Sequence, residues 1–294
     1  MIFLRIWILC KIKLKNYFNI LIQMNLDLIY VYDSENKSIP EYTYDSIKSL
    51  CNKENINLHL IVNYPEIVFD ELENKKLYNL FNRVVISKIK TYKKFNVVYH
   101  PQFRDNFFGK CINRFFILDN YIKKNNLTKC FHCECDIFFQ VSLNEIYNQI
   151  EDKNKIYSCR DAPARIIASI MYIPDAEKIF NMTEYFITML GNGEELNDME
   201  LLNNFDRVFK EINSFKTSPI DNSTPYIFDP ACFGQNLLGI DPRNTSEKST
   251  VGFINETSTY KPVYTNFKNI NGEWFYMEYK LAILHIHCKD FSNL

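Results

Sequence analysis

Two carboxylates stand two residues apart at the end of an apolar, cysteine-rich run near the middle of the chain. They are Glu134 and Asp136 of FHCECDIFF. Carboxylates are costly to bury unless cations meet them. Hard divalent cations such as Mg²⁺ and Mn²⁺ take oxygen ligands and keep positions open for phosphate. The pair therefore indicates a site for a divalent metal and a diphosphate, although an isolated E-x-D at a strand end more often points into water.

A second set of polar residues with the same spacing lies near the end of the sequence. LHIHCK carries His285, His287 and Lys289, so two of the five histidines fall within one tripeptide. A neutral imidazole suits a borderline metal, and an ammonium suits a phosphate. If this segment is a strand, all three side chains project to one side, and as a terminal strand it would bury only a modest area. Together with the acidic pair it predicts a mixed oxygen and nitrogen shell; the alternative is a polar strand near a frayed terminus.

The run from Cys130 to Phe139 is predicted to be one strand, in which alternate side chains share a face. One face would carry Cys130, His132, Glu134 and Asp136, and the other Cys133 and Cys135. The crowding of cysteine and histidine makes zinc an alternative. Contiguous residues of one strand point to opposite faces, however, and they lack the looped C-x₂-C arrangement of structural zinc sites. A site for Mn²⁺ or Mg²⁺ is therefore the stronger interpretation.

The elements that must position these residues alternate in type through the first half of the chain. The predicted strands are 26–32, 56–64, 84–89, 95–100 and 130–139, and the predicted helices are 41–52, 69–81 and 111–124. This alternation implies an α/β fold with a mostly parallel, twisted sheet flanked by helices on both faces. Open sheets of this kind bind ligands at the carboxyl ends of their strands, where Tyr32 and Asp33 also stand.

The second half of the chain is organised differently. Strands are predicted at 155–161 and 168–174, and helices at 175–190 and 198–209. From Ser214 onward Pro, Asn, Ser and Thr predominate, with short segments such as GEWFYMEY and AILHIHC among them. No linker marks two independent domains, so a single domain is predicted over residues 25–294, with a loop-rich half that begins at 143.

The composition is that of a folded domain and argues against several other classes. The chain has 294 residues, of which 47% are hydrophobic, which is ample for a buried core. Its formal net charge of −1 lacks the basic excess typical of a nucleic-acid-binding protein. Nine cysteines follow no spacing that suggests a disulfide framework, which favours a reducing compartment. A cytoplasmic protein without a nucleic-acid partner is therefore expected.

Residues 1–24 differ from the rest, because MIFLRIWILC is followed by alternating basic and apolar residues. Charges at Arg5, Lys11, Lys13 and Lys15 interrupt the apolar run too soon for a membrane span of about 20 residues. The charge order and the small residues of a signal peptide are both missing. We interpret the segment as an extension upstream of Met24; the alternative is a basic amphipathic helix in peripheral contact with a membrane.

The acidic run and its surroundings resemble the signature of GT-A-type glycosyltransferases. In NRFFILDNYIKKNNLTKCFHCECDIFF an Arg-Phe-Phe helix leads into a strand that ends in a His-x-Glu-x-Asp form of the DxD motif. Similarity to the same group, which is encoded by large DNA viruses and some bacteria, extends to RIIASIMYIP, LNDMELL, FDPACFGQNLLGIDPRN, VGFINET and LHIHCK. The resemblance spans about residue 25 to the end. It departs at Glu134, where Asp is commonest, and at Cys288, where Ser is expected.

The resemblance implies a hexosyl- or related transferase of glycan biosynthesis, working in the host cytoplasm or viral factory if the chain is viral. It implies a UDP- or GDP-linked sugar donor, a glycan or protein acceptor, and Mn²⁺ or Mg²⁺. Residues 25–142 would bind the donor, and 143–294 would face the acceptor and supply a metal-binding C-terminal segment. Asp136 would bind the metal, with Glu134 near the ribose or a metal-bound water. His287 or His285 would complete the shell, and Lys289 would face the diphosphate.

Other donor-side contacts are expected from residues next to this pair. Tyr32 and Asp33, at the end of the first strand, would meet the base and the ribose of the nucleotide. Arg114 lies on the helix before the acidic run and would reach the donor phosphates. The alternative for Arg114 is a place on the helix surface, paired with Asp119 or with solvent.

The catalytic base is predicted among three carboxylates, because an inverting transfer needs one to take the proton of the acceptor hydroxyl. LNDMELL offers Asp198 and Glu200, and FDPACFGQ offers Asp229. Asp229 is favoured, since apolar neighbours would raise its pKa if it is buried. Asp198 is equally suited to be a helix N-cap. Arg160 and Asp161 are expected to contact the sugar.

Two other functions compete with sugar transfer. A nucleotidyltransferase also joins a sheet of this kind to a metal and a nucleotide, but it normally has a Gly-rich phosphate loop near the first strand, which this sequence lacks. A sugar- or nucleotide-binding module without turnover is the second, and the retained acids and histidines argue against it. Metal-dependent release of nucleotide from a donor separates these functions from a working transferase.

Overall fold

The computed structural model describes residues 25–34, 36–50, 56–89, 106–220, 224–240, 251–292 and 294. The N-terminal segment 1–24 and the predicted strand 95–100 lie outside these ranges. None of the helices in the described ranges is long and apolar enough to cross a membrane.

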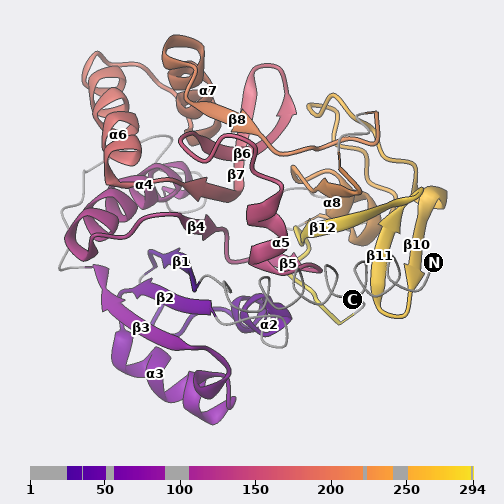
Figure 1. Ribbon diagram of the computed structural model, residues 1–294, viewed down its shortest axis with the longest axis horizontal. Helices are drawn as coiled ribbons and strands as arrows, with labels where there is room; N and C mark the ends of the chain where they lie inside the picture. The colour runs from indigo at the N-terminus through magenta and orange to yellow at the C-terminus, as the bar shows by residue number, and fades with distance from the viewer. Residues whose placement is uncertain are drawn as a thin grey trace, which may run out of the picture.

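The larger of two sheets has seven strands in the order β3-β2-β1-β4-β7-β6-β8, which follow one another across the molecule (Figure 1). These strands are β1 (Leu26–Tyr32), β2 (Ile56–Val62), β3 (Arg83–Lys88), β4 (Cys130–Cys133), β6 (Ile156–Ala162), β7 (Arg165–Ile173) and β8 (Ile212–Ser214). The pairs β1–β2, β1–β4, β2–β3 and β6–β8 are parallel, and only β7 runs antiparallel to its neighbours β4 and β6. The predicted α/β fold with a mostly parallel sheet is confirmed.

Helices cover both faces of this sheet, because the buried strands are apolar on both sides. In β1, Leu28 and Tyr30 join one core cluster, and Ile29 and Val31 join another. The first cluster includes α2 (Glu41–Leu50), α3 (Pro65–Asn74) and α5 (Leu143–Asn148). The second includes α4 (Phe107–Asn125), α6 (Ala176–Gly191) and α7 (Asp198–Phe209). The helix predicted at 198–209 is present with the predicted ends, the one predicted at 41–52 begins at Glu41 as predicted, and those predicted at 111–124 and 175–190 are present with shifted ends.

One predicted helix begins earlier than its apolar spacing indicated. The helix expected over 69–81 starts at Pro65 and ends at Asn74, and a 3₁₀ turn follows at Tyr78–Leu80. Proline is favoured in the first helical turn because the amide there has no intrahelical partner.

The smaller sheet lies beside the larger one and is built mainly from the C-terminal part of the chain (Figure 1). Its strands run in the order β10-β11-β12-β5, and β9 pairs with β12 as well. They are β5 (Ile137–Phe139), β9 (Tyr226–Phe228), β10 (Phe267–Ile270), β11 (Glu273–Tyr276) and β12 (Tyr279–His285), with the short helix α8 (Phe233–Leu238) packed on β12. Phe139, Phe228 and Ile283 of this sheet belong to the same core cluster as β1, so the two sheets share a core.

The prediction of one strand over Cys130–Phe139 is wrong. The chain leaves the large sheet after Cys133, turns through Glu134–Asp136, and enters the small sheet at Ile137. Backbone partners decide this, since the N–H of Glu134 donates to the carbonyl of Ser169 at 3.1 Å while Ile137 pairs with His285 of β12. The two carboxylates therefore lie in a turn between two sheets and not on one face of a strand.

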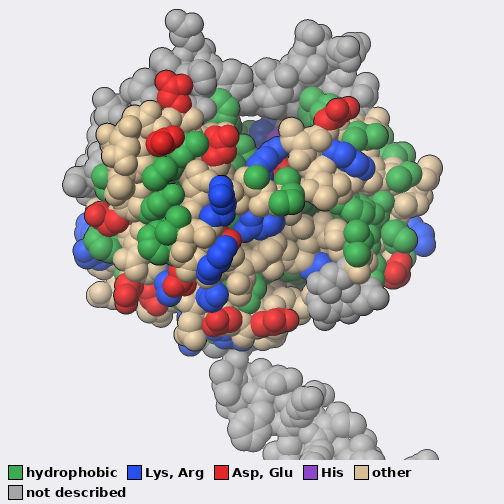
Figure 2. Space-filling model, turned by 90° about the horizontal axis from the view of Figure 1, so that it is seen from above, with side chains coloured by type: hydrophobic (Ala, Val, Ile, Leu, Met, Phe, Trp, Pro, Cys, Tyr) green, Lys and Arg blue, Asp and Glu red, His purple; other side chains and the backbone are tan. Residues whose placement is uncertain are grey.

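The outer surface over α6, α7 and β8 carries charges of both signs. Figure 2 shows a short row of Lys and Arg side chains across this face, with Asp and Glu around it and hydrophobic side chains beside it. Among the charged residues of α6, α7 and β6, Lys178 pairs with Glu211 at 2.8 Å and Arg160 pairs with Asp206 at 2.9 Å.

Candidate functional site

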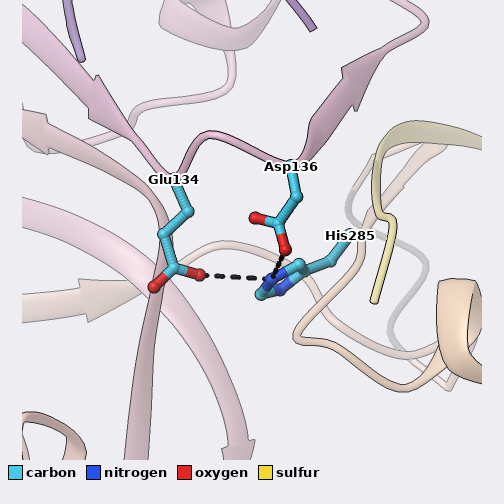
Figure 3. Close-up of side chains that lie close together, drawn as sticks. All are labelled: Glu134, Asp136 and His285. Carbon is cyan, nitrogen blue, oxygen red and sulfur yellow. Dashed lines mark ion pairs between the residues drawn. The ribbon is translucent and has the colours of Figure 1, made fainter. Parts of the chain in front are cut away.

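The turn between the two sheets brings Glu134 and Asp136 next to His285, the last residue of β12 (Figure 3). The Nε2 atom of His285 lies 3.3 Å from Oε2 of Glu134 and 3.2 Å from Oδ2 of Asp136. One ligand atom from each of the three residues lies within 4.8 Å of the others. Asp136 and His285 are each 5% exposed. Two carboxylates and an imidazole thus converge at the carboxyl edge of β4.

The electrostatics of this cluster follow from burial opposed by close charges. Burial raises the pKa of Asp136, but His285 and Lys289 outweigh it and hold the pKa well below its usual range. Burial likewise raises the pKa of Glu134, and Arg114 and His285 bring it below its usual range. For His285 burial lowers the pKa, but the charges of Asp136 and Glu134 raise it above that of a free histidine. The cluster therefore favours a cation between the two carboxylates.

This donor set fits a divalent metal. Two carboxylate oxygens and one imidazole nitrogen are ligands that Mn²⁺ accepts, and carboxylate oxygens suit Mg²⁺. The second ring nitrogen of His285, Nδ1, is buried and has no hydrogen-bond partner among the described residues. The ring points its Nε2 atom at the carboxylates. Because no described residue forms a hydrogen bond with Nδ1, another contact must fix the orientation of the ring.

Arg114 is buried beside this cluster and not on the helix surface. Its Nη1 atom donates to Oε1 of Glu134 at 2.5 Å, and its Nη2 atom donates to Oδ2 of Asp198 at 2.6 Å. The alternative partner, Asp119, instead accepts from Thr183 at 3.3 Å. Arg114 therefore links one ligand candidate to a candidate base. Its position inside the apolar helix NRFFIL was the signal in the sequence, because a buried guanidinium needs carboxylate partners.

Asp198 does not cap helix α7. The N-cap is Asn197, whose side chain accepts from the N–H of Glu200, while the Glu200 side chain accepts from the N–H of Asn197. The N-x-x-E spacing of a capping box was present in the sequence and identifies this pair. Glu200 is thus occupied as a cap. Asp198 instead turns to Arg114, and burial raises its pKa although Arg114 lowers it in part.

The C-terminal segment differs from the predicted strand with three side chains on one side. Strand β12 ends at His285, and a turn follows at His287 and Cys288. The ring of His287 lies 4.4 Å from that of His285, but His287 is not in the three-residue cluster, and its Nε2 has no partner among the described residues. Burial lowers the pKa of His287 to about 3, so its ring is neutral. Lys289 has a left-handed φ of 61°, and its ammonium contacts Oδ2 of Asp136.

The expectation that the terminal strand buries only a modest area is wrong. Leu281, Ile283 and Leu284 are 0% exposed, and β12 pairs with β5, β9 and β11 at the centre of the small sheet. Truncation after Ala282 would therefore remove core residues together with the site, and it would not isolate the function of the tail.

Asp229 does not fit the predicted part of general base. It is 0% exposed, and its two oxygens already accept from the N–H groups of Cys232, Phe233, Gly234 and His285. A carboxylate has about four acceptor positions, so none is left for an acceptor hydroxyl. Burial raises the pKa of Asp229, as expected, but the groups that contact its carboxylate are backbone N–H groups.

The remaining predicted residues do not belong to the three-residue cluster. Tyr32 and Asp33 stand at the carboxyl end of β1, which pairs in parallel with β4, and Asp33 accepts from Asn63 at 3.3 Å. Arg160 lies within β6 and binds α7, through Asn203 at 2.9 Å and Asp206 at 2.9 Å. Asp161, also in β6, is paired with Arg165 at 3.1 Å.

No family model and no curated protein matches the chain. Several solved glycosyltransferase structures are similar to it. The glycosyltransferase GlyE of Streptococcus pneumoniae TIGR4 has a TM-score of 0.45 at 13% identity over 65% of this chain and 45% of its own. The galactosyltransferase LgtC has a TM-score of 0.43 at 14% identity over 65% and 73% of the two chains. For the bifunctional WbbM the values are 0.41 and 12%, over 72% and 42%. The matched region spans less than half of GlyE and of WbbM, and similarity of this degree carries no argument about activity.

Proposed function

We propose that this chain is a glycosyltransferase of the GT-A type, which moves a sugar from a UDP- or GDP-linked donor to a hydroxyl of a glycan or protein. The observation that carries the proposal is the cluster of partly exposed Glu134 with buried Asp136 and His285 at the carboxyl edge of a mostly parallel sheet. Ligands bind at this edge in open α/β sheets. The cluster also coincides with the His-x-Glu-x-Asp segment and the LHIHCK segment, on which the sequence resemblance rests.

Glu134, Asp136 and His285 would hold Mn²⁺ or Mg²⁺, since their donor atoms converge and the site favours a cation. When bound, such a metal would fix the diphosphate of the donor and offset its charge. Lys289 is placed to assist, because its ammonium already contacts Asp136 and could turn to an incoming phosphate. The ring of His287 packs beside that of His285 and supports it.

The chain's own residues suggest how a donor and an acceptor would be handled. Tyr32 and Asp33, at the end of β1, would receive the nucleoside. Arg114 holds Glu134 in place and pairs with Asp198 beside it. Of the three carboxylates predicted as the base, Asp198 is therefore the one we retain, since its carboxylate lies at the site and burial raises its pKa toward the value that a general base needs.

Asp136→Asn tests the proposal, because it removes one charged ligand with almost no change of volume. We expect metal-dependent release of nucleotide from UDP- and GDP-sugars to fall by at least about 100-fold, as measured by nucleotide product over time. Asp206→Asn is the matched control, since Asp206 is an ion-paired aspartate of α7 away from the cluster. Its nucleotide release should stay near the wild-type value.

Three outcomes would contradict the proposal. Undiminished nucleotide release by Asp136→Asn would remove the metal site from the reaction. Release of pyrophosphate from nucleoside triphosphates, without action on nucleotide sugars, would identify a nucleotidyltransferase. Tight donor binding without any release would identify a binding module.

A further inference from the structure

Asp229 lies in the loop between β9 and α8 and is tied to two separate parts of the chain. Its Oδ1 accepts from the N–H groups of Cys232 at 2.8 Å and Phe233 at 2.9 Å. Its Oδ2 accepts from the N–H of Gly234 at 2.7 Å and from that of His285 at 2.9 Å. Three of these bonds are local and hold the first turn of α8. The fourth reaches the end of β12, 56 residues along the chain.

The fourth bond occupies a place where strand pairing has stopped. The last pair between β9 and β12 joins Phe228 to Ile283, and Pro230, which has no N–H to continue a ladder, follows two residues later. Successive N–H groups of a strand point to opposite sides. On one side, Ile286 donates to the carbonyl of Asp136 at 2.8 Å. On the other side, the N–H of His285 donates to the carboxylate of Asp229, which takes the place of the backbone carbonyl of a neighbouring strand.

Gly234 brings the backbone of α8 against the same residue. A Cβ atom at position 234 would lie 2.2 Å from the carbonyl oxygen of His285 and 2.9 Å from Oδ2 of Asp229. Contacts that close with backbone and a buried carboxylate require glycine. The main chain of His285 is thus held at its N–H by Asp229 and packed at its carbonyl by Gly234. Asp229 is itself anchored to the large sheet, because Ser169 of β7 donates to its carbonyl at 3.4 Å.

We infer that Asp229 is a positioning residue, which fixes His285 so that its imidazole meets Glu134 and Asp136 at the metal site. The inference rests on the proposed metal-dependent function. A ligand ring must be held within about 0.5 Å of its productive place, and here the carboxylate sets that place through the backbone of the ligand. Capping of α8 alone would not require the bond to His285.

The test compares two aspartate caps in the full-length protein. Asp229→Asn keeps the volume but puts an NH₂ group in place of one oxygen, and because each oxygen accepts two N–H groups, two of the four bonds are lost. Asp175→Asn is the matched control, because Asp175 caps α6 through the N–H groups of Glu177 and Lys178 and lies outside the site. Mn²⁺ affinity is measured by electron paramagnetic resonance of the free ion, and folding by urea titration. We expect both variants to lose stability, but only Asp229→Asn to weaken Mn²⁺ binding, by about 10- to 100-fold.

A second variant covers the case in which Asp229→Asn does not fold. Asp229→Ser retains an oxygen that can cap α8 but is too short to serve His285 as well, so the same loss of Mn²⁺ affinity is expected. Folded Asp229 variants with wild-type Mn²⁺ affinity would overturn the inference and leave the proposed function standing. A wild-type protein that binds no Mn²⁺ and releases no nucleotide would instead refute the proposed function, and the inference with it.

Discussion

Glu134 and Asp136 stay ionised in a buried turn because cationic side chains from three other places in the chain surround them. Arg114 comes from α4, His285 from the end of β12, and Lys289 from the turn beyond it. Each carboxylate has at least two cationic neighbours, which offsets the cost of burial. The arrangement leaves the imidazole of His285 as the exchangeable cation, since a proton on it can be replaced by a metal.

The stability of the metal-free protein should therefore depend on pH through His285. Its pKa is raised in the folded protein, so its stabilising contribution is complete below the unfolded value of about 6.5 and is lost as pH rises through the folded value. The stability difference between wild type and His285→Gln should be largest near pH 6 and shrink toward pH 9, by about 1.4 kcal/mol for each pH unit that separates the folded pKa from the unfolded one. Urea unfolding in the presence of a chelator measures it. A difference that does not change with pH would show that no proton is held between the carboxylates.

Three elements that are distant in sequence meet at Arg114. The guanidinium joins α4 to the turn after β4 and to the first turn of α7. The side chain of Arg114 is only 10% exposed, and that of Asp198 is 8% exposed. Removal of the arginine would leave the buried carboxylate of Asp198 and the partly buried one of Glu134 without this cation.

Arg114→Met should accordingly cost about 3–5 kcal/mol of unfolding free energy, because it leaves uncompensated buried charge. Lys75→Met is the control, since Lys75 pairs with Glu41 at 2.6 Å on the surface, where the two side chains are 33% and 71% exposed. The exposed pair should be worth less than about 1 kcal/mol. Urea denaturation at neutral pH compares them. Equal losses in both variants would mean that the buried network does not hold the three elements together.

On the scale of the whole molecule, the site is the junction of two sheets that share one core. β4 and β5 are separated only by the turn that carries Glu134 and Asp136, and β12 of the small sheet supplies His285. Phe139, Ile283 and Leu28 lie in the same buried cluster. The arrangement of Glu134, Asp136 and His285 therefore depends on both sheets being folded together.

Residues 1–23 should be dispensable to this junction, because the residues placed at the site all lie within 25–294. A protein that begins at Met24 should have the urea midpoint, the Mn²⁺ affinity and the nucleotide release of the full chain. These three measurements and sedimentation with anionic vesicles test the expectation. Aggregation of the shorter protein would show that residues 1–23 are needed for solubility. Sedimentation of the full chain with vesicles, without sedimentation of the shorter protein, would show that they bind the membrane.

Much of the architecture was present in local sequence patterns. LDLIYVY and INLHLIV are short, apolar and β-branched, and the segments between them have helical spacing, so a parallel sheet flanked by helices followed from periodicity. The E-x-D acids and the histidines of LHIHCK also stood out in the sequence, because few other segments cluster such donors, and the structure brings His285 but not His287 into the three-residue cluster. These inferences depend on side-chain type and spacing, which a sequence contains in full.

Only the tertiary structure decided where the strand breaks and what each buried charge meets. FHCECDIFF is uniformly suited to a strand, and its division after Cys133 depends on Ser169 and β12, which compete for its backbone from distant parts of the chain. Asp229 and Asp198 are both carboxylates beside apolar residues, yet one receives the N–H of His285 and the other the guanidinium of Arg114. Their surroundings differ because partners 56 and 84 residues away satisfy them, and no local pattern records contacts of that range.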